Sequence, residues 1–254
     1  MEVKLISFTP DPELLAAAAA RLCYRDVSAA ALMQELGESD VERLLDIVIS
    51  SGHHSVIEHI TFTFAIDGVS RVLTHQLVRH RVGIAFSQQS QRYVSVESAP
   101  FVTPRAIRRS ETFAVEYAQL MQRCMDLYRR MMLDPTISAE DARFALPQAV
   151  ETRLVMTANL RQLIHMYAIN ACFRSQWEFR QLMFAVKAGV RRVSPRLARE
   201  MRIKCFASGS CDEEYICNEL AGRMPRRAST APNHAEQLDN LARLSRLEAE
   251  VEGL

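Results

Sequence analysis

Residues 60–66 alternate between bulky apolar and smaller side chains, and this alternation constrains the fold more than any other stretch of the chain. A period of two places the bulky members on one face of a strand: Ile60, Phe62, Phe64 and Ile66. We therefore predict a half-buried strand at this position. An earlier strand is expected in EVKLISFTP, which Pro10 ends.

Three helices are expected around these strands. The first begins in DPELLAAAAARLCY, where Asp11 is a suitable N-cap and Pro12 takes the first helical position. The second covers about residues 39–50, ends at a Ser-Gly pair and has apolar residues at helical spacing: Val41, Leu44, Leu45 and Val48. The third, SRVLTHQLVRHR, carries basic residues at its C-terminal end, where the helix dipole favours cations.

Residues from about 106 to 188 are predicted to be strongly helical, with breaks at 134–138 and at Pro147. Ser138 and Asp141 resemble a capping pair for a short helix in AEDARFAL. The helix expected after Pro147 is apolar on most sides, so its polar residues would be buried and would need partners. Asn170 and Arg174 would share a face of it. The full polar set is Arg143, Asn159, Arg161, His165, Asn170, Arg174, Gln176 and Glu178.

The overall composition argues against several classes of protein. A net charge of +1 speaks against a broad nucleic-acid-binding surface. No apolar run reaches the roughly 18 residues of a membrane helix, and the start of the chain lacks an export signal, so we expect a soluble, cytoplasmic protein. The six cysteines are scattered without a CxxC pair, which predicts reduced thiols and neither disulfides nor a zinc ribbon.

The last part of the chain changes in composition. Residues 1–221 are expected to form one domain, and residues 222–234 have the composition of a linker. Residues 235–254 then place leucines on one helical stripe, which predicts an amphipathic helix for docking or self-association.

The segment SGHHSVIEH places several polar side chains directly before the predicted strand: His53, His54, Ser55, Glu58 and His59. The HExxH spacing is absent and no matching cluster occurs elsewhere, so we expect no metal site. Imidazoles and a hydroxyl in a loop could hydrogen-bond a phosphate or a ring. A capped turn ahead of the strand would account for the same residues.

The segment RHRVGIAFSQQSQR begins with three adjacent basic residues and continues with neutral hydroxyls and amides as far as Arg92. Three consecutive side chains at a helix end point in different directions and would contact different partners. The neutral run that ends in a guanidinium suits a phosphorylated polar ligand. A solvated helix end followed by a polar loop would fit nearly as well.

Five segments occur in the order and spacing of one enzyme family: GHHSVIEHITFTF, QLVRHR followed by SQQSQRYV, ARFALP, TANLRQLIHM and RSQWEFR. Over about residues 1–220 the sequence resembles the flavin-dependent thymidylate synthases. The resemblance implies an α+β fold, with a mostly antiparallel sheet flanked by long helices, in a homotetramer whose active sites are shared between subunits. It also implies FAD as cofactor, with NADPH and 5,10-methylenetetrahydrofolate as co-substrates, for methylation of C5 of the uracil of dUMP.

The resemblance assigns roles to individual residues by their position in these motifs. Arg79, Asn170 and Arg174 are the candidates for a direct part in catalysis. No enzyme nucleophile is implied, because reduced flavin supplies a hydride while the protein orients the reactants and stabilises charge. The residues expected near FAD or the folate are His53, Ser55, Glu58, Arg79, His80, Arg81, Asn159, Arg161 and His165. Those expected to hold the nucleotide are Gln76, Arg79, Gln88, Gln89, Ser90, Gln91, Arg92, Arg143 and Asn170.

Two departures from the family pattern bear on the substrate. Eight residues, VGIAFSQQ, precede Ser90 where the family usually has seven, so the loop at the nucleotide must bulge or shift. Ile169-Asn170 stands where the family has an arginine that contacts the pyrimidine. Arg174 or the neutral Asn170 amide would have to replace that contact, because loss of a charge-assisted hydrogen bond typically costs about 1.5–3 kcal/mol.

We therefore expect conversion of dUMP to dTMP, with UMP as a variant substrate in a specialised pathway such as nucleoside-antibiotic synthesis. A hypothesis of another class is an inactive relative that binds flavin or nucleotide and serves as a regulatory or assembly partner. The intact RHR, GHxS and NxR segments argue against it, because a retired site need not keep polar groups that are costly to bury.

Overall fold

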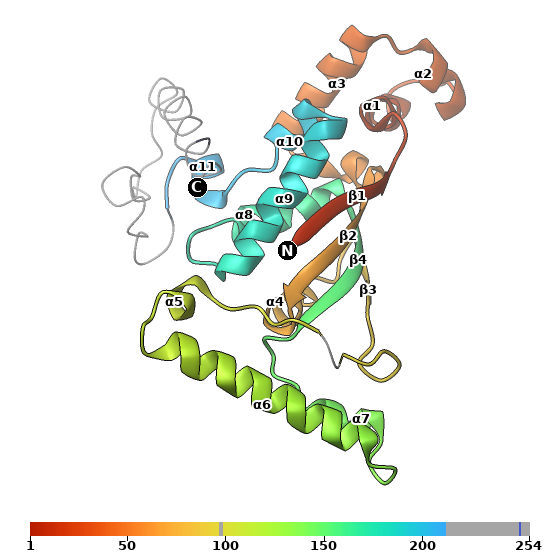
Figure 1. Ribbon diagram of the computed structural model, residues 1–254. Helices are drawn as coiled ribbons and strands as arrows, with labels where there is room; N and C mark the ends of the chain where they lie inside the picture. The colour runs from red at the N-terminus through yellow and green to blue at the C-terminus, as the bar shows by residue number, and fades with distance from the viewer. Residues whose placement is uncertain (97–98, 212–248, 250–254) are drawn as a thin grey trace. The chain divides into compact units, whose positions relative to one another are not determined.

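The computed structural model describes residues 1–96, 99–211 and 249. The chain divides into two compact units, the first comprising residues 1–4, 65–81 and 85–156, the second residues 5–64, 82–84 and 157–254. Figure 1 labels the helices and strands of both units. The predicted linker over 222–234 and the predicted C-terminal helix over 235–254 lie outside the described residues, apart from position 249.

Four strands of the described part of the chain form one antiparallel sheet: β1 Glu2–Phe8, β2 Thr61–Ser70, β3 Ile84–Gln88 and β4 Glu151–Asn159. Their order across the sheet is β1-β2-β4-β3. The two strands predicted from the sequence are therefore neighbours, and β4 lies between β2 and β3. The prediction of an α+β fold with a mostly antiparallel sheet and long helices is confirmed.

The predicted alternation in β2 separates a buried face from a partly exposed one. Its bulky residues Phe62, Phe64 and Ile66 are fully buried, each at 0% exposure, and so is Ile60 directly before the strand. On the other face the hydroxyl of Thr63 lies 3.0 Å from the hydroxyl of Thr157 in β4. Helix α9, Trp177–Val193, crosses so close to the buried face that a Cβ on Gly189 would meet the Phe64 ring at 2.7 Å.

Residues 151–159 form strand β4, and not the helix that we predicted after Pro147. The strand alternates in burial, and its inward residues are at most 4% exposed: Thr152, Leu154, Met156 and Ala158. The same period of two is readable in ETRLVMTAN. Leu, Met and Ala are also good helix formers, so local propensity pointed to the wrong element.

The second unit is mostly helical. Asp11 stands at the N-cap of its first helix, but the residue is left-handed, with φ of 44°, and makes no side-chain cap, so the predicted capping role is wrong. The helix predicted over about 39–50 is confirmed, and it buries the four expected apolar residues. The helices are α1 Pro12–Leu22, α2 Ala29–Glu35, α3 Glu38–Ser50, the 3-10 helix η1 His54–His59, α8 Leu160–Asn170, α9, α10 Pro195–Arg199 and α11 Lys204–Ser208.

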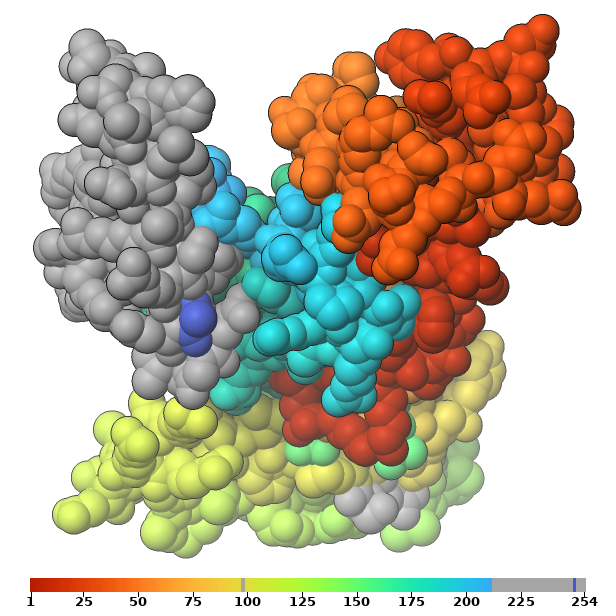
Figure 2. Space-filling model, turned by 90° about the horizontal axis from the view of Figure 1, so that it is seen from above, coloured from red at the N-terminus to blue at the C-terminus, as the bar shows by residue number. Residues whose placement is uncertain are grey.

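Arg196 joins three helices of this unit. Its guanidinium lies 2.9 Å from a carboxylate oxygen of Asp46, and it also pairs with Glu42, both on α3. Glu13 on α1 is 3.6 Å away. The side chain of Arg196 is only 21% exposed, so these ion pairs are better shielded from water than ordinary surface pairs. Figure 2 shows the α10 segment, in cyan, against the orange α3.

In its described residues, the first unit carries five helical segments: α4 Arg71–Leu77, α5 Arg105–Arg108, α6 Phe113–Leu133, α7 Ala139–Ala142 and the 3-10 helix η2 Arg143–Ala145. The predicted capping pair before α7 is confirmed. The Ser138 hydroxyl accepts a hydrogen bond from the Asp141 amide at 3.2 Å and donates one to the Asp141 carboxylate at 2.7 Å.

Helix α6 supports the segment that follows α7. Tyr128 on α6 is fully buried and packs with Val96 and Ala142. Leu146, just beyond η2, packs against the same cluster. This apolar contact positions residues 143–148, of which Leu146, Pro147 and Gln148 form one wall of a pocket in the first unit.

Within the described ranges, no helix combines the length and hydrophobicity that a membrane span requires. No group of three His, Cys, Asp or Glu side chains among those residues is arranged to hold a metal ion. The five cysteines that the structure describes all carry free thiols: Cys23, Cys124, Cys172, Cys205 and Cys211.

Candidate active site

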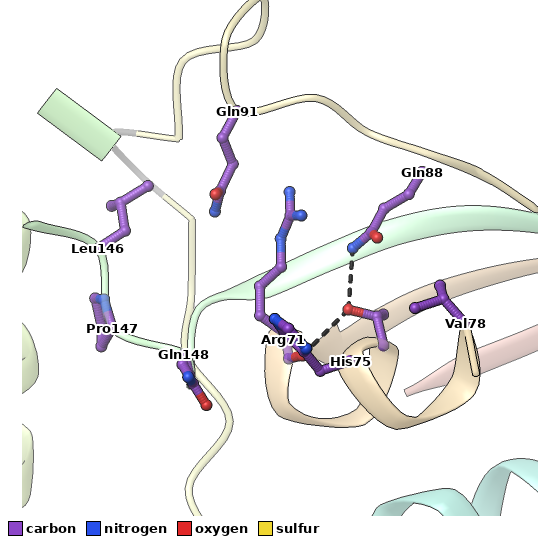
Figure 3. A pocket seen from close by; sticks show the side chains of 9 residues that line it. Arg71, His75, Val78, Gln88, Gln91, Leu146, Pro147 and Gln148 are labelled. Atoms are coloured by element: carbon purple, nitrogen blue, oxygen red, sulfur yellow. Dashed lines mark hydrogen bonds between the residues drawn. The ribbon is translucent and has the colours of Figure 1, made fainter. Parts of the chain in front are cut away.

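The first unit contains a pocket of about 320 Å³ (Figure 3). Its walls come from α4, from the end of β3 with the turn after it, and from the segment after η2. The residues that line it are Arg71, Thr74, His75, Val78, Gln88, Gln91, Leu146, Pro147 and Gln148. It therefore combines a cation, an imidazole and three amides with a short apolar wall, a set that suits a polar ligand with an anionic group.

Helix α4 presents one face to this pocket. Arg71, Thr74, His75 and Val78 are spaced i, i+3, i+4 and i+7, which places them on one side of the helix. The N-cap Ser70 fixes the start of the helix, because its hydroxyl accepts a hydrogen bond from the Leu73 amide at 3.1 Å. Arg71 therefore has a well-defined backbone position in the first turn.

Arg71 is the cation of the pocket. One terminal nitrogen of its guanidinium donates to the Gln89 carbonyl at 2.9 Å. Its Nε is buried and finds no hydrogen-bond partner in the described part of the chain. Burial lowers the pKa of this guanidinium, and the positive charge of Arg143 lowers it further. Arg71 is thus a partly desolvated cation at the pocket, and its buried Nε is a donor without a partner in the described residues.

Gln88 is held by two threonines of neighbouring elements. Its amide nitrogen donates to the hydroxyl of Thr74 on α4 at 3.2 Å and to that of Thr152 on β4 at 3.3 Å. The Thr74 hydroxyl donates in turn to the carbonyl of Arg71 at 3.2 Å, and Figure 3 draws this chain of bonds from Gln88 to Arg71. Gln88 was predicted from the family motif, whereas neither threonine was.

Two predicted nucleotide-binding arginines share one carboxylate. Arg92 lies 2.9 Å from one oxygen of Glu140, and Arg143 lies 3.7 Å from the other. Nε of Arg143 also donates to the Glu140 carbonyl at 3.0 Å. Glu140 thus holds two guanidinium groups of the first unit in place, and one of them is the Arg143 whose charge acts on Arg71.

The structure separates the predicted nucleotide-binding residues of the first unit into two groups. Gln88 and Gln91 line the pocket, whereas Gln76, Gln89 and Ser90 do not. Gln89 contributes its backbone carbonyl to Arg71, and the Ser90 hydroxyl accepts a hydrogen bond from the Arg92 amide at 3.1 Å. Gln76 is exposed in the last turn of α4.

The basic triplet follows α4 directly, as predicted. The amide of Arg79 donates to the Gln76 carbonyl at 3.1 Å, and that of His80 to the Leu77 carbonyl at 3.2 Å, so the turn continues the helix for a few residues. Arg79 and Arg81 are exposed, and His80 is half-buried. None of the three lines the pocket.

Sequence reasoning missed Arg71, His75, Gln148 and the two threonines. The helical spacing of Arg71, His75 and Val78 is the signal that could have found the α4 residues, because these positions surround the predicted Gln76 on an amphipathic helix. No local pattern marks Thr152 or Gln148, since their approach to α4 depends on the pairing of distant strands.

A second cluster lies in the second unit, on η1 and the first turns of α8, which pack against each other. It contains predicted cofactor-binding residues whose side chains are exposed: His53, Ser55, Glu58, Arg161 and His165. Glu58 and Arg161 form an ion pair with each other. Hydroxyl, imidazole and guanidinium groups on one exposed surface can donate hydrogen bonds to an anionic cofactor.

Asn159 has a structural role in this cluster. It is the N-cap of α8, and its side-chain oxygen accepts a hydrogen bond from the Gln162 amide at 2.8 Å. Gly83, with φ of 64°, passes so close that a Cβ there would lie 2.5 Å from the Asn159 side-chain nitrogen. The backbone amide of Asn159 donates a hydrogen bond to the Gly83 carbonyl at 2.9 Å. The turn before β3 is thereby tied to the start of α8.

Two expectations about the polar set of the second unit are wrong. Arg161, His165 and Arg174 are exposed, not buried, because strand β4 and the shorter α8 turn these positions outwards. Asn170 is the last residue of α8, so it does not share a helical face with Arg174 in the following turn. Its side-chain nitrogen donates to the Met166 carbonyl at 3.1 Å.

Residues 4–196 match the family described as Thymidylate synthase complementing protein. The sequence is 44% identical over 215 residues to a flavin-dependent thymidylate synthase of Geobacter sulfurreducens, covering 84% of this chain and 91% of that protein. It is 37% identical over 241 residues to a flavin-dependent thymidylate synthase of Clostridium tetani, covering 89% and 96%.

The fold also matches a solved structure. A UMP/dUMP methylase, PolB from Streptomyces cacaoi, crystallised with 5-Br dUMP, superposes with a TM-score of 0.66. The match covers 78% of this chain and 93% of the other at 22% sequence identity, so it speaks for the fold alone.

Proposed function

The chain belongs to the flavin-dependent thymidylate synthase family, and from this premise we propose that it methylates C5 of the uracil of a uridine monophosphate. The co-substrates in this proposal are 5,10-methylenetetrahydrofolate, which provides the carbon, and NADPH, which provides the reducing equivalents. The first-choice substrate is dUMP, which becomes dTMP.

The observation that carries the proposal is the unused donor of Arg71. A buried guanidinium nitrogen without a partner costs free energy unless a ligand satisfies it. The neighbouring charge of Arg143 adds repulsion that a bound anion would relieve. A phosphate monoester provides both the acceptor oxygens and the negative charge. We therefore assign Arg71 and Arg143 to the phosphate of the nucleotide.

The rest of the pocket suits a nucleoside. The amides of Gln88, Gln91 and Gln148 can exchange hydrogen bonds with uracil and with sugar hydroxyls. Leu146 and Pro147 offer apolar surface to a ring. The pocket therefore orients the nucleotide through neutral contacts, while the arginines hold its anionic end.

The cluster on η1 and α8 fits FAD by its donor chemistry. His53, Ser55, Arg161 and His165 would donate hydrogen bonds to the diphosphate and the polar edges of the cofactor, and the resemblance adds Arg79, His80 and Arg81. The ion pair with Glu58 would hold Arg161 in position. When bound, the flavin would supply the hydride that completes the methyl group. The protein would orient the reactants and shield them from water.

Asn170 is neutral where the family has an arginine, so the preference between dUMP and UMP is a question for experiment. With a neutral residue at this position, we assign the pyrimidine contact to Arg174, which lies exposed in the turn between α8 and α9. UMP is the second candidate substrate, because the segment before Ser90 is one residue longer than is usual in the family.

Assembly into a homotetramer with shared sites is also part of the proposal. Helix α6 buries Met121, Met125 and Tyr128 in its own unit, yet it exposes a second apolar stripe. Three residues spaced by seven form this stripe, at 60%, 48% and 42% exposure: Phe113, Leu120 and Leu127. Heptad spacing is typical of a helix that packs against another helix. Light scattering of Leu120→Arg should show a smaller particle than the unmodified protein.

Mass spectrometry of the product tests the function. The FAD-loaded protein is incubated with methylenetetrahydrofolate, NADPH and either dUMP or UMP. A product one methylene heavier than the nucleotide supports the proposal and identifies the sugar. If both nucleotides bind without turnover, the alternative of an inactive, nucleotide-binding relative with a regulatory or assembly role is correct instead.

A further inference from the structure

Thr74 has a single hydroxyl proton, and the structure shows where it goes. The hydroxyl donates to the Arg71 carbonyl, one turn back along α4, at 3.2 Å. A carbonyl oxygen can only accept, so this proton is not available to any other neighbour. Toward Gln88 the Thr74 oxygen can therefore act only as an acceptor.

This restriction decides which way round the Gln88 amide lies. Its NH2 group must face Thr74 at 3.2 Å, because the opposite orientation would place two acceptor oxygens against each other. The same nitrogen lies 3.3 Å from the Thr152 hydroxyl, so both of its protons are used. Thr74 and Thr152 are each only 3% exposed, and water does not compete freely for these bonds.

We infer that Thr74 and Thr152 are positioning residues that lock Gln88 with its carbonyl oxygen available to the nucleotide. Gln88 lines the pocket, and no donor in the described ranges bonds to that oxygen. The inference rests on the proposed function, because it assigns the free acceptor to a donor group of the bound nucleotide. Such a donor is the imide N–H of uracil or a sugar hydroxyl.

The lock joins three elements that are distant in the sequence. Gln88 ends β3, Thr74 lies on α4 and Thr152 lies on β4. The adjacent residue, Gln89, is fixed by its amide, which donates to the Arg153 carbonyl on β4 at 2.9 Å. Both the backbone and the side chain at this point are therefore defined before a ligand arrives, which lowers the entropy lost on binding.

The test combines Thr74→Val, Thr152→Val and Gln88→Ala with calorimetric titration of dUMP into the FAD-loaded enzyme. Valine keeps the shape of threonine but frees the amide to turn, so each valine variant should weaken dUMP binding about fivefold. Thr74→Ser restores the hydroxyl and should restore the affinity. In the Gln88→Ala background, Thr74→Val should have no further effect, because the group that it positions is absent.

The lock itself can be observed without nucleotide. Glutamine labelled with 15N in its side chain gives an NMR signal for the Gln88 amide, and Thr74→Val should shift it and speed its exchange with water. An unchanged signal, or a Thr74→Val effect on binding that is equally large without Gln88, would overturn the inference. If Thr74→Val shifts the signal but the wild-type protein binds no dUMP, the proposed function is refuted instead.

Discussion

Arg143 lies close enough to Arg71 for its positive charge to lower the pKa of the Arg71 guanidinium, in addition to the larger effect of burial. Two like charges that interact in this way are unfavourable unless an anion lies between them. The contact between Arg143 and Glu140 offsets this repulsion in part, but not fully. This arrangement is what we expect of a phosphate site before its ligand binds.

Replacing Arg71 with Gln should weaken binding of dUMP by about tenfold or more. The change removes a charge-assisted hydrogen bond, which typically contributes about 1.5–3 kcal/mol. Titration calorimetry of the purified variant measures the effect. Arg153→Gln is a matched control, because Arg153 has a 72% exposed side chain and pairs only loosely with Asp67, at 3.4 Å. Equal affinities in the two variants would refute the phosphate assignment.

Gly83→Ala should destabilise the protein, because φ of 64° and a 2.5 Å approach to the Asn159 amide both oppose a Cβ. Strain of this kind costs about 1–3 kcal/mol, and each kcal/mol lowers the unfolding midpoint of a protein this size by about 2–4 °C. Thermal unfolding followed by circular dichroism gives the value. Gly37→Ala provides the comparison, since Gly37 has φ of −81° and open space around it. A similar midpoint for both variants would contradict the account of this turn.

Substitutions at Asn159 should separate its capping role from cofactor binding. Asn159→Ala removes the cap of α8 and should cost about 0.5–2 kcal/mol in unfolding free energy. Asn159→Asp keeps an oxygen for the Gln162 amide, so its stability should stay near that of the wild type. The added negative charge should nevertheless weaken FAD binding, measured by flavin fluorescence. Unchanged FAD affinity in Asn159→Asp would remove this residue from the cofactor site.

The contribution of Glu200 to stability should fall as the pH rises above about 4.5. Burial raises the pKa of this carboxyl above its ordinary value of 4.5, although the positive charges of Arg202, His54 and Arg199 oppose the shift and only Asp46 adds to it. The folded state therefore binds the proton more tightly than the unfolded state, and the advantage disappears as the pH passes the folded pKa. Glu200→Gln should flatten this part of the profile in urea unfolding measured across pH. An identical slope in the variant would rule out Glu200 as the cause.

Local sequence patterns predicted those parts of the fold that neighbouring residues determine. The alternation of Phe62 and Phe64, the helical stripe around Leu45 and the Ser138 cap each depend on a few adjacent residues. Strand β4 was missed because its residues also favour helix, and only pairing with β2 and β3 selects the extended form. The family resemblance, read from motifs, is confirmed.

The candidate site was predictable only in part. The motif identified Gln88 and Gln91, which do line the pocket, but not Arg71, which also lines it. It also did not identify Thr152, which bonds Gln88 from strand β4, 64 residues further along the chain. Polar residues such as His165 were expected to be buried because the surrounding sequence is apolar. Their exposure follows from the actual start of α8 after β4.

The most direct test of the central claim is release of tritium from dUMP labelled at C5, with purified protein, FAD, NADPH and methylenetetrahydrofolate. Methylation at C5 must expel the hydrogen of that carbon, so the account predicts release that requires all three added compounds and that falls sharply in Arg79→Ala. No release from dUMP or from labelled UMP, with FAD bound, or turnover unchanged in Arg79→Ala, would contradict it.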